Sequence, residues 1–469
     1  MKTVLLIRPD LPEDYPMGKL PPFLPLGLGQ LAGVLKQAGF SVVILDNYLY
    51  EKNTNELAQD IRAVKPDLIG LTVSVATIST CAEIIAAMKN DNIPIVAGGP
   101  QITIAPVETM KLLGADIGVG GEGENTLLEL CRTLDRTGRL SFSHLKNISG
   151  LIIKDAQTNQ YLLTPPRELI KDLDTLPFIP VSIFPYKKYQ KTTPELKSSP
   201  LGWMSTSRGC PWNCSFCSNI LVWGRHYRCM GAKRVVDEMQ YLSENFGIKA
   251  INFREDNFTV NRQRVLDICS LINQRNLKIE WTCESRVDIV DEEMLAAMKN
   301  AGCSAVYFGI ESGSQRILDL LRKDTTVEQN INAVKMCKKV GIKPIASIML
   351  GVPQQTLAEN YESIRFIKKL DPDMVYFNVF MGLPGTDLYR YIIEHDLIYK
   401  KVGLIILPNS ECLTWPQKLK LKQRTELLYN LNPKILFRHI RRMGLLRFLQ
   451  KGFLTIRRYA SSRCGLERA

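Results

Sequence analysis

Two successive series of alternating strands and helices constrain the fold of this 469-residue chain more than any other feature. In the first series, short β-branched runs alternate with helical stretches, and this alternation favours a parallel sheet covered by helices on both faces. The predicted strands of the first series are 3–8, 40–45, 67–73, 93–97 and 116–119. We therefore expect an α/β domain over residues 1–140, with its ligand at the carboxyl ends of the strands.

A second series of strands and helices begins near residue 203. Its strands are expected at 203–207, 250–254, 279–283, 304–309, 343–349 and 374–379. Six such strand–helix units suit an open, partial barrel, whose chemistry lies at the carboxyl ends of the strands. Prolines interrupt the rhythm between the two series, so we predict a hairpin at 148–163 and a linker within the segment 141–195. The barrel then covers 196–395, and a basic, helical C-terminal region follows over 396–469.

Three cysteines gather in the loop that follows the first predicted barrel strand, namely Cys210, Cys214 and Cys217. Thiolates are the natural ligands of iron–sulfur clusters, and three of them leave one iron of a four-iron cluster open to bind a substrate. The alternative is a zinc site, for which His226 and Cys229 are the local candidates as a fourth ligand. Neither has the usual spacing of a zinc finger, so position and spacing together favour the iron–sulfur cluster.

The spacing of these cysteines matches in full the CxxxCxxC motif of the radical S-adenosylmethionine (SAM) superfamily, which the chain resembles over about residues 196–395. The resemblance implies a TIM-like (β/α)6 partial barrel that carries a 4Fe-4S cluster, with SAM chelated to the open iron. In that family one electron cleaves SAM, and the resulting 5′-deoxyadenosyl radical removes a hydrogen atom from an unactivated carbon. The resemblance also implies an external electron donor such as flavodoxin or ferredoxin.

Polar residues at the ends of the predicted barrel strands fit the same family. The residues that the resemblance assigns to SAM are Glu255, Asp256, Ser285, Arg286 and Glu311. Glu255 and Asp256 stand where the family places acidic groups for the SAM amino group, and Arg286 is suited to the SAM carboxylate. Each of these residues has a simpler alternative as a surface charge or a structural ion pair. No catalytic acid or base is identified.

Small residues follow three neighbouring strands of the first domain, where glycines allow a bulky ligand to approach the backbone; tight turns are the alternative explanation. The motifs Pro25-Leu26-Gly27-Leu28, Gly98-Gly99-Pro100 and Gly121-Glu122-Gly123-Glu124 resemble those of the cobalamin-binding domain that precedes the barrel in one radical SAM branch. This resemblance, over about residues 1–135, implies a flavodoxin-like, Rossmann-type fold that binds cobalamin. The residues assigned to cobalamin are Ser74, Thr77, Gly98, Gly99, Gly121 and Glu122.

The first domain departs from many cobalamin proteins at the histidine that binds the lower face of the cobalt. Where those proteins carry a DxHxxG motif, this chain reads Asp46-Asn47-Tyr48-Leu49-Tyr50-Glu51, and its four histidines all lie outside the domain. The lower ligand of the cobalt is therefore unassigned. A methylthiotransferase that modifies transfer RNA would carry three cysteines in its N-terminal domain, whereas this domain offers only Cys81 and Cys131. A second cluster is therefore not expected, and neither is this class of enzyme.

The net charge of +13 is concentrated near the C-terminus, because residues 416–469 contain five Lys and nine Arg against two Glu. The rest of the chain is close to neutral, so a nucleic-acid partner is not expected. Apolar residues at steps of three and four over 433–459 predict a basic amphipathic helix. Such a helix either docks on the barrel or lies on an anionic membrane surface, and both alternatives stay open.

The N-terminal apolar run is too short for a secretory signal, and no apolar run reaches the roughly 20 residues of a membrane span. We expect a cytoplasmic location, with peripheral membrane contact through the C-terminal region as the open alternative. The leading functional hypothesis is a cobalamin-dependent radical SAM methyltransferase that acts on an unactivated carbon of a small-molecule or lipid-like substrate. The alternatives are a ring-forming, oxidative cyclase-type enzyme of the same branch and a non-catalytic corrinoid or redox-sensing binding protein.

Overall fold

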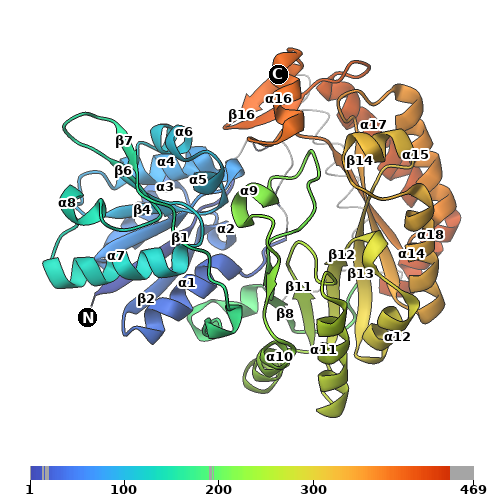
Figure 1. Cartoon of the computed structure of the whole chain (residues 1–469), viewed down its shortest axis with the longest axis horizontal. Helices are drawn as coiled ribbons and strands as arrows, with labels where there is room; N and C mark the ends of the chain where they lie inside the picture. The colour runs from blue at the N-terminus through green and yellow to red at the C-terminus, as the bar shows by residue number, and fades with distance from the viewer. Residues whose placement is uncertain are drawn as a thin grey trace.

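The computed structural model describes residues 2–12, 15, 19, 21–189, 193 and 195–443, and side chains of the last helix only as far as Arg438. Two α/β units lie side by side, the N-terminal unit in blue and cyan and the barrel in green to orange (Figure 1). Both units are built mainly on parallel strand pairs, so the predicted fold class is confirmed.

The first sheet contains seven strands. They are β1 (Thr3–Arg8), β2 (Ser41–Asp46), β3 (Leu68–Thr72), β4 (Ile95–Gly98), β5 (Ile117–Val119), β6 (Leu151–Lys154) and β7 (Tyr161–Leu163). Their order is β2-β1-β3-β4-β5-β6-β7, and β1 to β5 pair in parallel. The strand order reverses between β1 and β3, and ligands of such sheets bind at this switch point.

Helices cover both faces of the first sheet, as its uniformly apolar strands require. On one face α1 (Leu26–Gln37) packs against α7 (Gly123–Thr137), and both bury leucines in the core beneath them. The helices of the other face are α3 (Thr54–Val64), α4 (Ile78–Ala87) and α6 (Pro106–Leu113). Short helical segments are α2 (Asn47–Tyr50), η1 (Val75–Thr77), α5 (Pro100–Ile104) and α8 (Phe142–Leu145).

The second sheet contains six parallel strands. They are β8 (Leu201–Met204), β11 (Ala250–Phe253), β12 (Glu280–Ser285), β13 (Cys303–Glu311), β14 (Lys343–Leu350) and β15 (Met374–Val379). Their order is β15-β14-β13-β12-β11-β8, and in the described part of the chain the two outer strands do not pair with each other. The sheet is therefore a partial barrel, and each strand lies within a few residues of its predicted position.

Helices cover the outer face of this barrel. They are α10 (Ala232–Phe246), α11 (Arg262–Gln274), α12 (Glu292–Asn300), α14 (Val327–Val340) and α15 (Leu357–Leu370). The shorter α13 (Gln315–Leu320) and α16 (Asp387–Glu394) instead bury their apolar side chains in a separate cluster with Ile406. Local sequence sets their ends, because Thr326 and Thr356 begin capping boxes and Gly341 ends α14 in the left-handed conformation. Trp281 and Phe258 are buried in the core between the strands and the helices, and their ring centroids lie 5.5 Å apart.

The predicted hairpin at 148–163 is present as β6 and β7, and it extends the first sheet by pairing antiparallel with β5. The prediction of a helical C-terminal region is wrong at its start, where β16 (Ile398–Val402) and β17 (Ile405–Pro408) form an antiparallel hairpin. The apolar side chains of β17 explain this, because Ile405 and Leu407 pack with the buried Trp415. Two helices follow, α17 (Trp415–Asn430) and α18 (Pro433–Met443).

The start of the predicted basic helix docks on the barrel. Ile435 is buried, and the Arg438 guanidinium donates to the Pro372 carbonyl oxygen at 2.7 Å and to Asp371 at 3.0 Å. The rest of this predicted helix, 444–459, lies outside the described residues. No helix in the described part of the chain combines the length and apolarity that crossing a membrane requires.

Candidate functional site

A cavity of about 640 Å³ lies at the carboxyl ends of the strands of the first sheet, between that sheet and the barrel. All six residues that the sequence assigned to cobalamin line it. The barrel contributes the facing wall with Ser205, Arg208, Val222, Trp223, Met230 and Arg254. The two units therefore share one cavity, whose volume suits a sizeable ligand.

Glycines keep the sheet side of this cavity free of side chains. Gly99 has a φ angle of +105°, and a Cβ atom there would lie 2.9 Å from the Val73 carbonyl oxygen, so the turn itself requires glycine. At Gly98 a Cβ atom would meet no protein atom closer than Val119 Cβ, at 3.8 Å. No contact within the protein requires glycine at position 98. A glycine at this point of the cavity wall is therefore consistent with a ligand that lies against the backbone.

Tyr48 stands at the position where many cobalamin proteins carry the histidine, and its side chain lines the cavity. The Arg8 guanidinium lies 4.1 Å from the centre of the Tyr48 ring and 3.5 Å from the carboxylate of the buried Asp46. Asp46 also accepts a hydrogen bond of 2.6 Å from the Tyr189 hydroxyl. No histidine is among the described residues that line this cavity.

The Glu122 carboxylate is bonded within the protein through both oxygens. Its Oε1 lies 2.9 Å from an Arg208 nitrogen and 2.8 Å from an Arg228 nitrogen, and its Oε2 accepts a 2.6 Å hydrogen bond from the Ile170 N–H. Burial disfavours the charged carboxylate, but the arginines outweigh this effect and hold the pKa of Glu122 below its usual range. Glu122 thus belongs to the cavity wall as a paired charge.

The three predicted cluster ligands lie on a loop between β9 (Ser207–Arg208) and α9 (Asn219–Trp223). Gly209 opens this loop with a φ angle of +87°, and a Cβ atom there would collide with the His226 carbonyl group. Between the cysteines, Ser215 donates from its backbone N–H to the Leu321 carbonyl oxygen at 2.9 Å and from its hydroxyl to the Leu320 carbonyl oxygen at 3.1 Å. The barrel therefore fixes an irregular loop that carries all three thiols.

Two buried cations stand near Cys214. Arg286 Nη1 lies 4.0 Å from Cys214 Sγ, and its guanidinium packs on the Trp212 ring, 4.3 Å from the ring centre. The ammonium of Lys323 lies 3.0 Å from the Glu311 carboxylate. Burial raises the pKa of the Cys214 thiol, whereas Lys323 and Arg286 oppose this shift because they favour the thiolate. Their carboxylate partners, Asp288 and Glu311, compensate part of this positive charge, so the cations favour the thiolate only in part.

Each of the five residues assigned to SAM has a polar partner within the protein. Asp256 accepts a 2.5 Å hydrogen bond from Asn219, two residues beyond Cys217, and burial together with the charge of Glu255 raises the pKa of Asp256 to about 6. Arg286 and Glu311 also lie near the cysteine loop, and both are paired: Arg286 forms a bidentate ion pair with Asp288 at 2.9 Å, and Glu311 pairs with Lys323. The other two side chains are bonded to neighbouring hydroxyls: Glu255 accepts from Thr206 and Ser207, and Ser285 contacts Thr259 at 2.5 Å.

Sequence reasoning missed Lys323, Arg208 and Trp212. Lys323 lies in a charged turn between Arg322 and Asp324, which in the sequence is indistinguishable from an ordinary solvated turn. Its burial beside Glu311 follows from the left-handed turn at the end of β13, where Glu311 has a φ angle of +57°. The pairing of Arg208 with the first domain likewise depends on tertiary structure.

The donor set fits an iron–sulfur cluster, because three thiols share one irregular loop beside buried cations. Within the described ranges, no three His, Cys, Asp or Glu side chains converge to hold a metal ion. In a four-iron cluster each thiolate would bind a different iron, so the three cysteines need not converge on a single ion. The bare, glycine-lined edge of the first sheet likewise fits a ligand that approaches the backbone.

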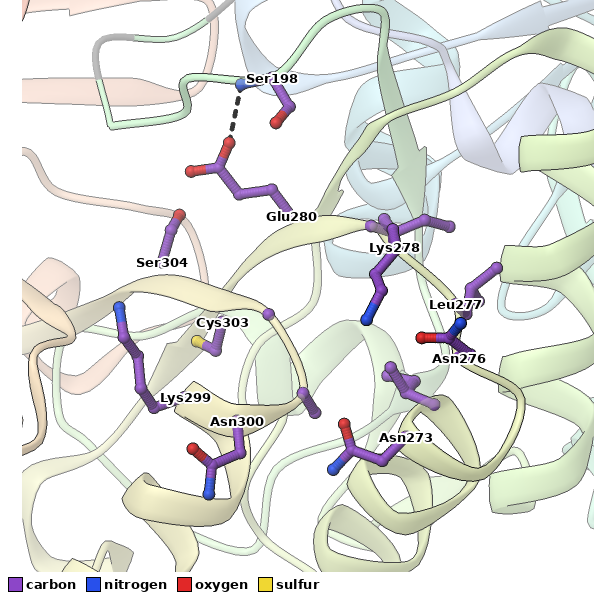
Figure 2. Close-up of a pocket in the computed structure, with 14 residues that line it drawn as sticks. Ser198, Asn273, Asn276, Leu277, Lys278, Glu280, Lys299, Asn300, Cys303 and Ser304 are labelled. Carbon is purple, nitrogen blue, oxygen red and sulfur yellow. Dashed lines mark hydrogen bonds between the residues drawn. The ribbon is translucent and has the colours of Figure 1, made fainter.

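A second hollow of about 400 Å³ lies at the opposite end of the barrel, where β12 and β13 begin (Figure 2). Its lining is polar, and Glu280 accepts hydrogen bonds from the backbone N–H groups of Ser198, at 2.7 Å, and Lys197, at 2.8 Å. None of the residues assigned to a cofactor lines it. The chemistry of parallel barrels lies at the other end of the strands, so this hollow is not the candidate site.

Comparison with known proteins identifies both units. The model of the radical SAM superfamily matches residues 204–367, and that of the B12 binding domain matches residues 21–131. An uncharacterized methyltransferase of Pyrococcus horikoshii is 36% identical over 424 residues, which cover 89% of this chain and 90% of that protein. The anaerobic magnesium-protoporphyrin IX monomethyl ester cyclase of Rubrivivax gelatinosus is 29% identical over 372 residues, 78% of this chain and 66% of the cyclase.

The fold is also similar to that of the radical SAM methyltransferase TsrM from Kitasatospora setae, with a TM-score of 0.69 and 22% identity over 86% of this chain and 76% of TsrM. The fold and the cysteine loop thus define a radical SAM enzyme. The chain belongs to the radical SAM superfamily, in the branch with a B12-binding domain, and its cofactors are a 4Fe-4S cluster, SAM and cobalamin. The two resemblances inferred from sequence are confirmed. The contacts of individual residues with each cofactor stay predictions.

Replacing Gly98 by Ala tests whether cobalamin lies against the end of β4. The added methyl group has room within the protein, so we expect an unchanged melting temperature but weaker cobalamin binding, measured by absorbance titration. Gly120→Ala is the matched control, since its Cβ would meet only Ile152 Cδ1 at 3.5 Å and Gly120 does not line the cavity. Equal cobalamin affinity in the two variants would contradict this placement of the ligand.

Replacing Asp256 by Asn tests the raised pKa of that carboxyl group. Its folded-state pKa of about 6 lies above the ordinary 3.8, so its contribution to stability is present at low pH and lost as the pH rises through about 6. The asparagine amide stays neutral at every pH, so D256N is expected to be more stable than the wild type near pH 8, by about 1–3 kcal/mol, with no such gain near pH 4. Chemical denaturation of the cluster-free proteins at both pH values measures this, and a gain of equal size at low pH would contradict it.

Proposed function

We propose that this chain is a cobalamin-dependent radical SAM methyltransferase that methylates an unactivated carbon of a small-molecule or lipid-like substrate. The observation that carries the proposal is the relationship with the Pyrococcus protein, which is named a methyltransferase and matches this chain through both cofactor domains. That match covers nearly the whole length of both proteins, whereas the match with the Rubrivivax cyclase leaves about a third of the cyclase uncovered.

The shared cavity supports this proposal. Arg208 lines it and stands two residues before Cys210, while Trp223 lines it and ends the helix that follows Cys217. A ligand of this cavity therefore contacts the chain segments that flank the cysteine loop on both sides. When bound, the cluster and SAM supply the radical, and cobalamin supplies the methyl group.

The residues of this chain provide charge, position and shelter from water. Arg286 and Lys323 hold positive charge near Cys214, and Glu255 fixes the segment before the cysteine loop through Thr206 and Ser207. The cavity is lined largely by apolar side chains, which limit the access of water to a reactive carbon radical. Apolar residues of the lining include Leu6, Phe23, Leu26, Leu31, Val96 and Val119.

Anaerobic reconstitution with iron, sulfide and cobalamin tests the radical chemistry. Under reduction the protein is expected to release 5′-deoxyadenosine from SAM, and the triple variant C210A/C214A/C217A is expected to lose both its iron and this activity. Cys229→Ala is the matched control and is expected to keep both, because Cys229 lies on β10 (Arg228–Cys229), outside the motif. Zinc at the three cysteines, or SAM cleavage by the triple variant, would contradict the proposal.

A ring-forming cyclase is the second candidate function, and the similarity to the Rubrivivax cyclase favours it. Product analysis separates the two reactions. A methyltransferase forms S-adenosylhomocysteine alongside 5′-deoxyadenosine, whereas ring formation consumes no methyl group. Reconstituted protein that binds both cofactors but never cleaves SAM would instead support a non-catalytic corrinoid-binding or sensing role.

Contact with an anionic membrane is part of the same proposal, because it would give access to a lipid-like substrate. The end of α17, the turn after it and the start of α18 expose the apolar residues Leu427, Leu428, Leu431 and Phe437, each at least 51% exposed. Arg424 and Lys434 lie in the same stretch, which belongs to the segment rich in Lys and Arg. Exposed apolar residues flanked by basic ones suit an anionic lipid surface.

The double variant L428S/F437S is expected to float less with phosphatidylglycerol vesicles than the wild type does, because it removes apolar anchors and leaves the charge unchanged. The matched control is L162S/L163S, which alters two leucines on β7 that are 42% and 50% exposed. Equal flotation of the two double variants would contradict membrane contact at this surface. Wild-type protein that bound neutral phosphatidylcholine vesicles as strongly as phosphatidylglycerol vesicles would contradict it as well.

A further inference from the structure

Four buried charged side chains join the two units at the start of the cysteine loop. Arg208, two residues before Cys210, donates to Glu122 at 2.9 Å and to Glu124 at 2.5 Å. Arg228, its partner across the β9–β10 pair, donates to Glu122 at 2.8 Å. Both glutamates stand at the N-terminal end of α7 in the cobalamin-binding domain. We call Glu122, Glu124, Arg208 and Arg228 the junction cluster.

All members of the junction cluster are withdrawn from solvent, with side-chain exposures between 3% and 12%. Ion pairs at this depth are screened little by salt, and the loss of one partner leaves an uncompensated buried charge. A buried ion pair is a weak source of net stability, because desolvation offsets much of the attraction. It does, however, disfavour every arrangement in which the charges separate, so it specifies how the two units meet.

The junction cluster touches the surroundings of both cofactors. Glu122, Glu124 and Arg208 line the cavity that is assigned to cobalamin. The Arg208 guanidinium also packs against the Trp223 ring, 5.2 Å from its centre, at the end of the helix that follows the cysteines. One side chain thus contacts the segments before and after the cluster ligands and two acidic residues of the other domain.

We propose that the junction cluster is a positioning device that fixes the distance between cobalamin in the first domain and the iron–sulfur cluster on the barrel. Its members are positioning residues, because they act through the cavity wall and the cysteine loop. The inference rests on the two cofactors of the family and not on methyl transfer, so a cyclase would use the device equally.

The two arginines make different demands on side-chain geometry. Arg208 directs Nη1 and Nη2 to two different carboxylates, a forked arrangement that the single ammonium of lysine does not reproduce. Arg228 uses Nη1 alone, for Glu122 and for the Ile170 carbonyl oxygen at 2.6 Å, and its Nε and Nη2 have no hydrogen-bond partner in the described part of the protein. Lysine is therefore expected to preserve the role of the side chain at position 228 but not at position 208.

Electron paramagnetic resonance of the holoprotein tests this proposal. After reduction with dithionite, cob(II)alamin and the reduced cluster are both paramagnetic, and their dipolar coupling falls steeply with the distance between them. We expect E122Q and R208K to show weaker and more broadly distributed coupling than the wild type, and R228K to keep the wild-type coupling. The matched control is E238Q, which neutralises a buried carboxylate 2.7 Å from Arg234 within α10.

The dipolar coupling is compared only between samples of wild type and variants that contain the same amounts of iron and cobalamin. Wild-type coupling in both E122Q and R208K would overturn the proposal, as would equal broadening in E238Q. If E122Q fails to fold, R208K decides the question, because it keeps the buried positive charge. The measurement does not depend on SAM cleavage or on methylation. Protein that shows the expected coupling but never methylates a substrate would therefore contradict the proposed function and leave the positioning role intact.

Discussion

Parallel strands end together, and this constraint gathers the functional residues of each unit at one edge of its sheet. In the first unit, β3, β4 and β5 deliver Ser74, Gly98 and Gly121 to a single cavity. In the barrel, the ends of β12 and β13 bring Arg286 and Glu311 toward the cysteine loop. Because the two edges meet across the cavity, cofactor sites that are far apart in the sequence become neighbours.

Features that depend on local sequence were predictable. Strand positions followed from apolar, β-branched runs, and the Cys210–Cys217 loop and Gly98-Gly99 turn followed from motifs whose spacing reflects chemistry. Features that depend on long-range pairing were not. The partner of β6 is decided by the free edge of β5, and the burial of Lys323 is decided by Glu311, twelve positions earlier and on another element.

The charged residues show why single-residue assignments from sequence are weaker than motif assignments. Glu122 and Glu255 occupy strand ends as expected, yet their carboxylates are bonded to Arg208 and to Thr206 within the protein. An acidic residue at the end of a strand can bind a ligand directly, or it can fix the loop that binds the ligand. Its position in the sequence is the same in both cases. Only the positions of its partners separate the two roles.

The pairing between Glu122 and Arg208 has a consequence for how such proteins diverge. The two residues lie in different domains and are buried against each other, so a domain exchanged into this chain needs a matching charge at the same position. A chimaera whose corrinoid module lacks an acid there would leave Arg208 with an unmatched charge at the seam. The modules of this chain are thus separable as folds but matched in charge where they meet.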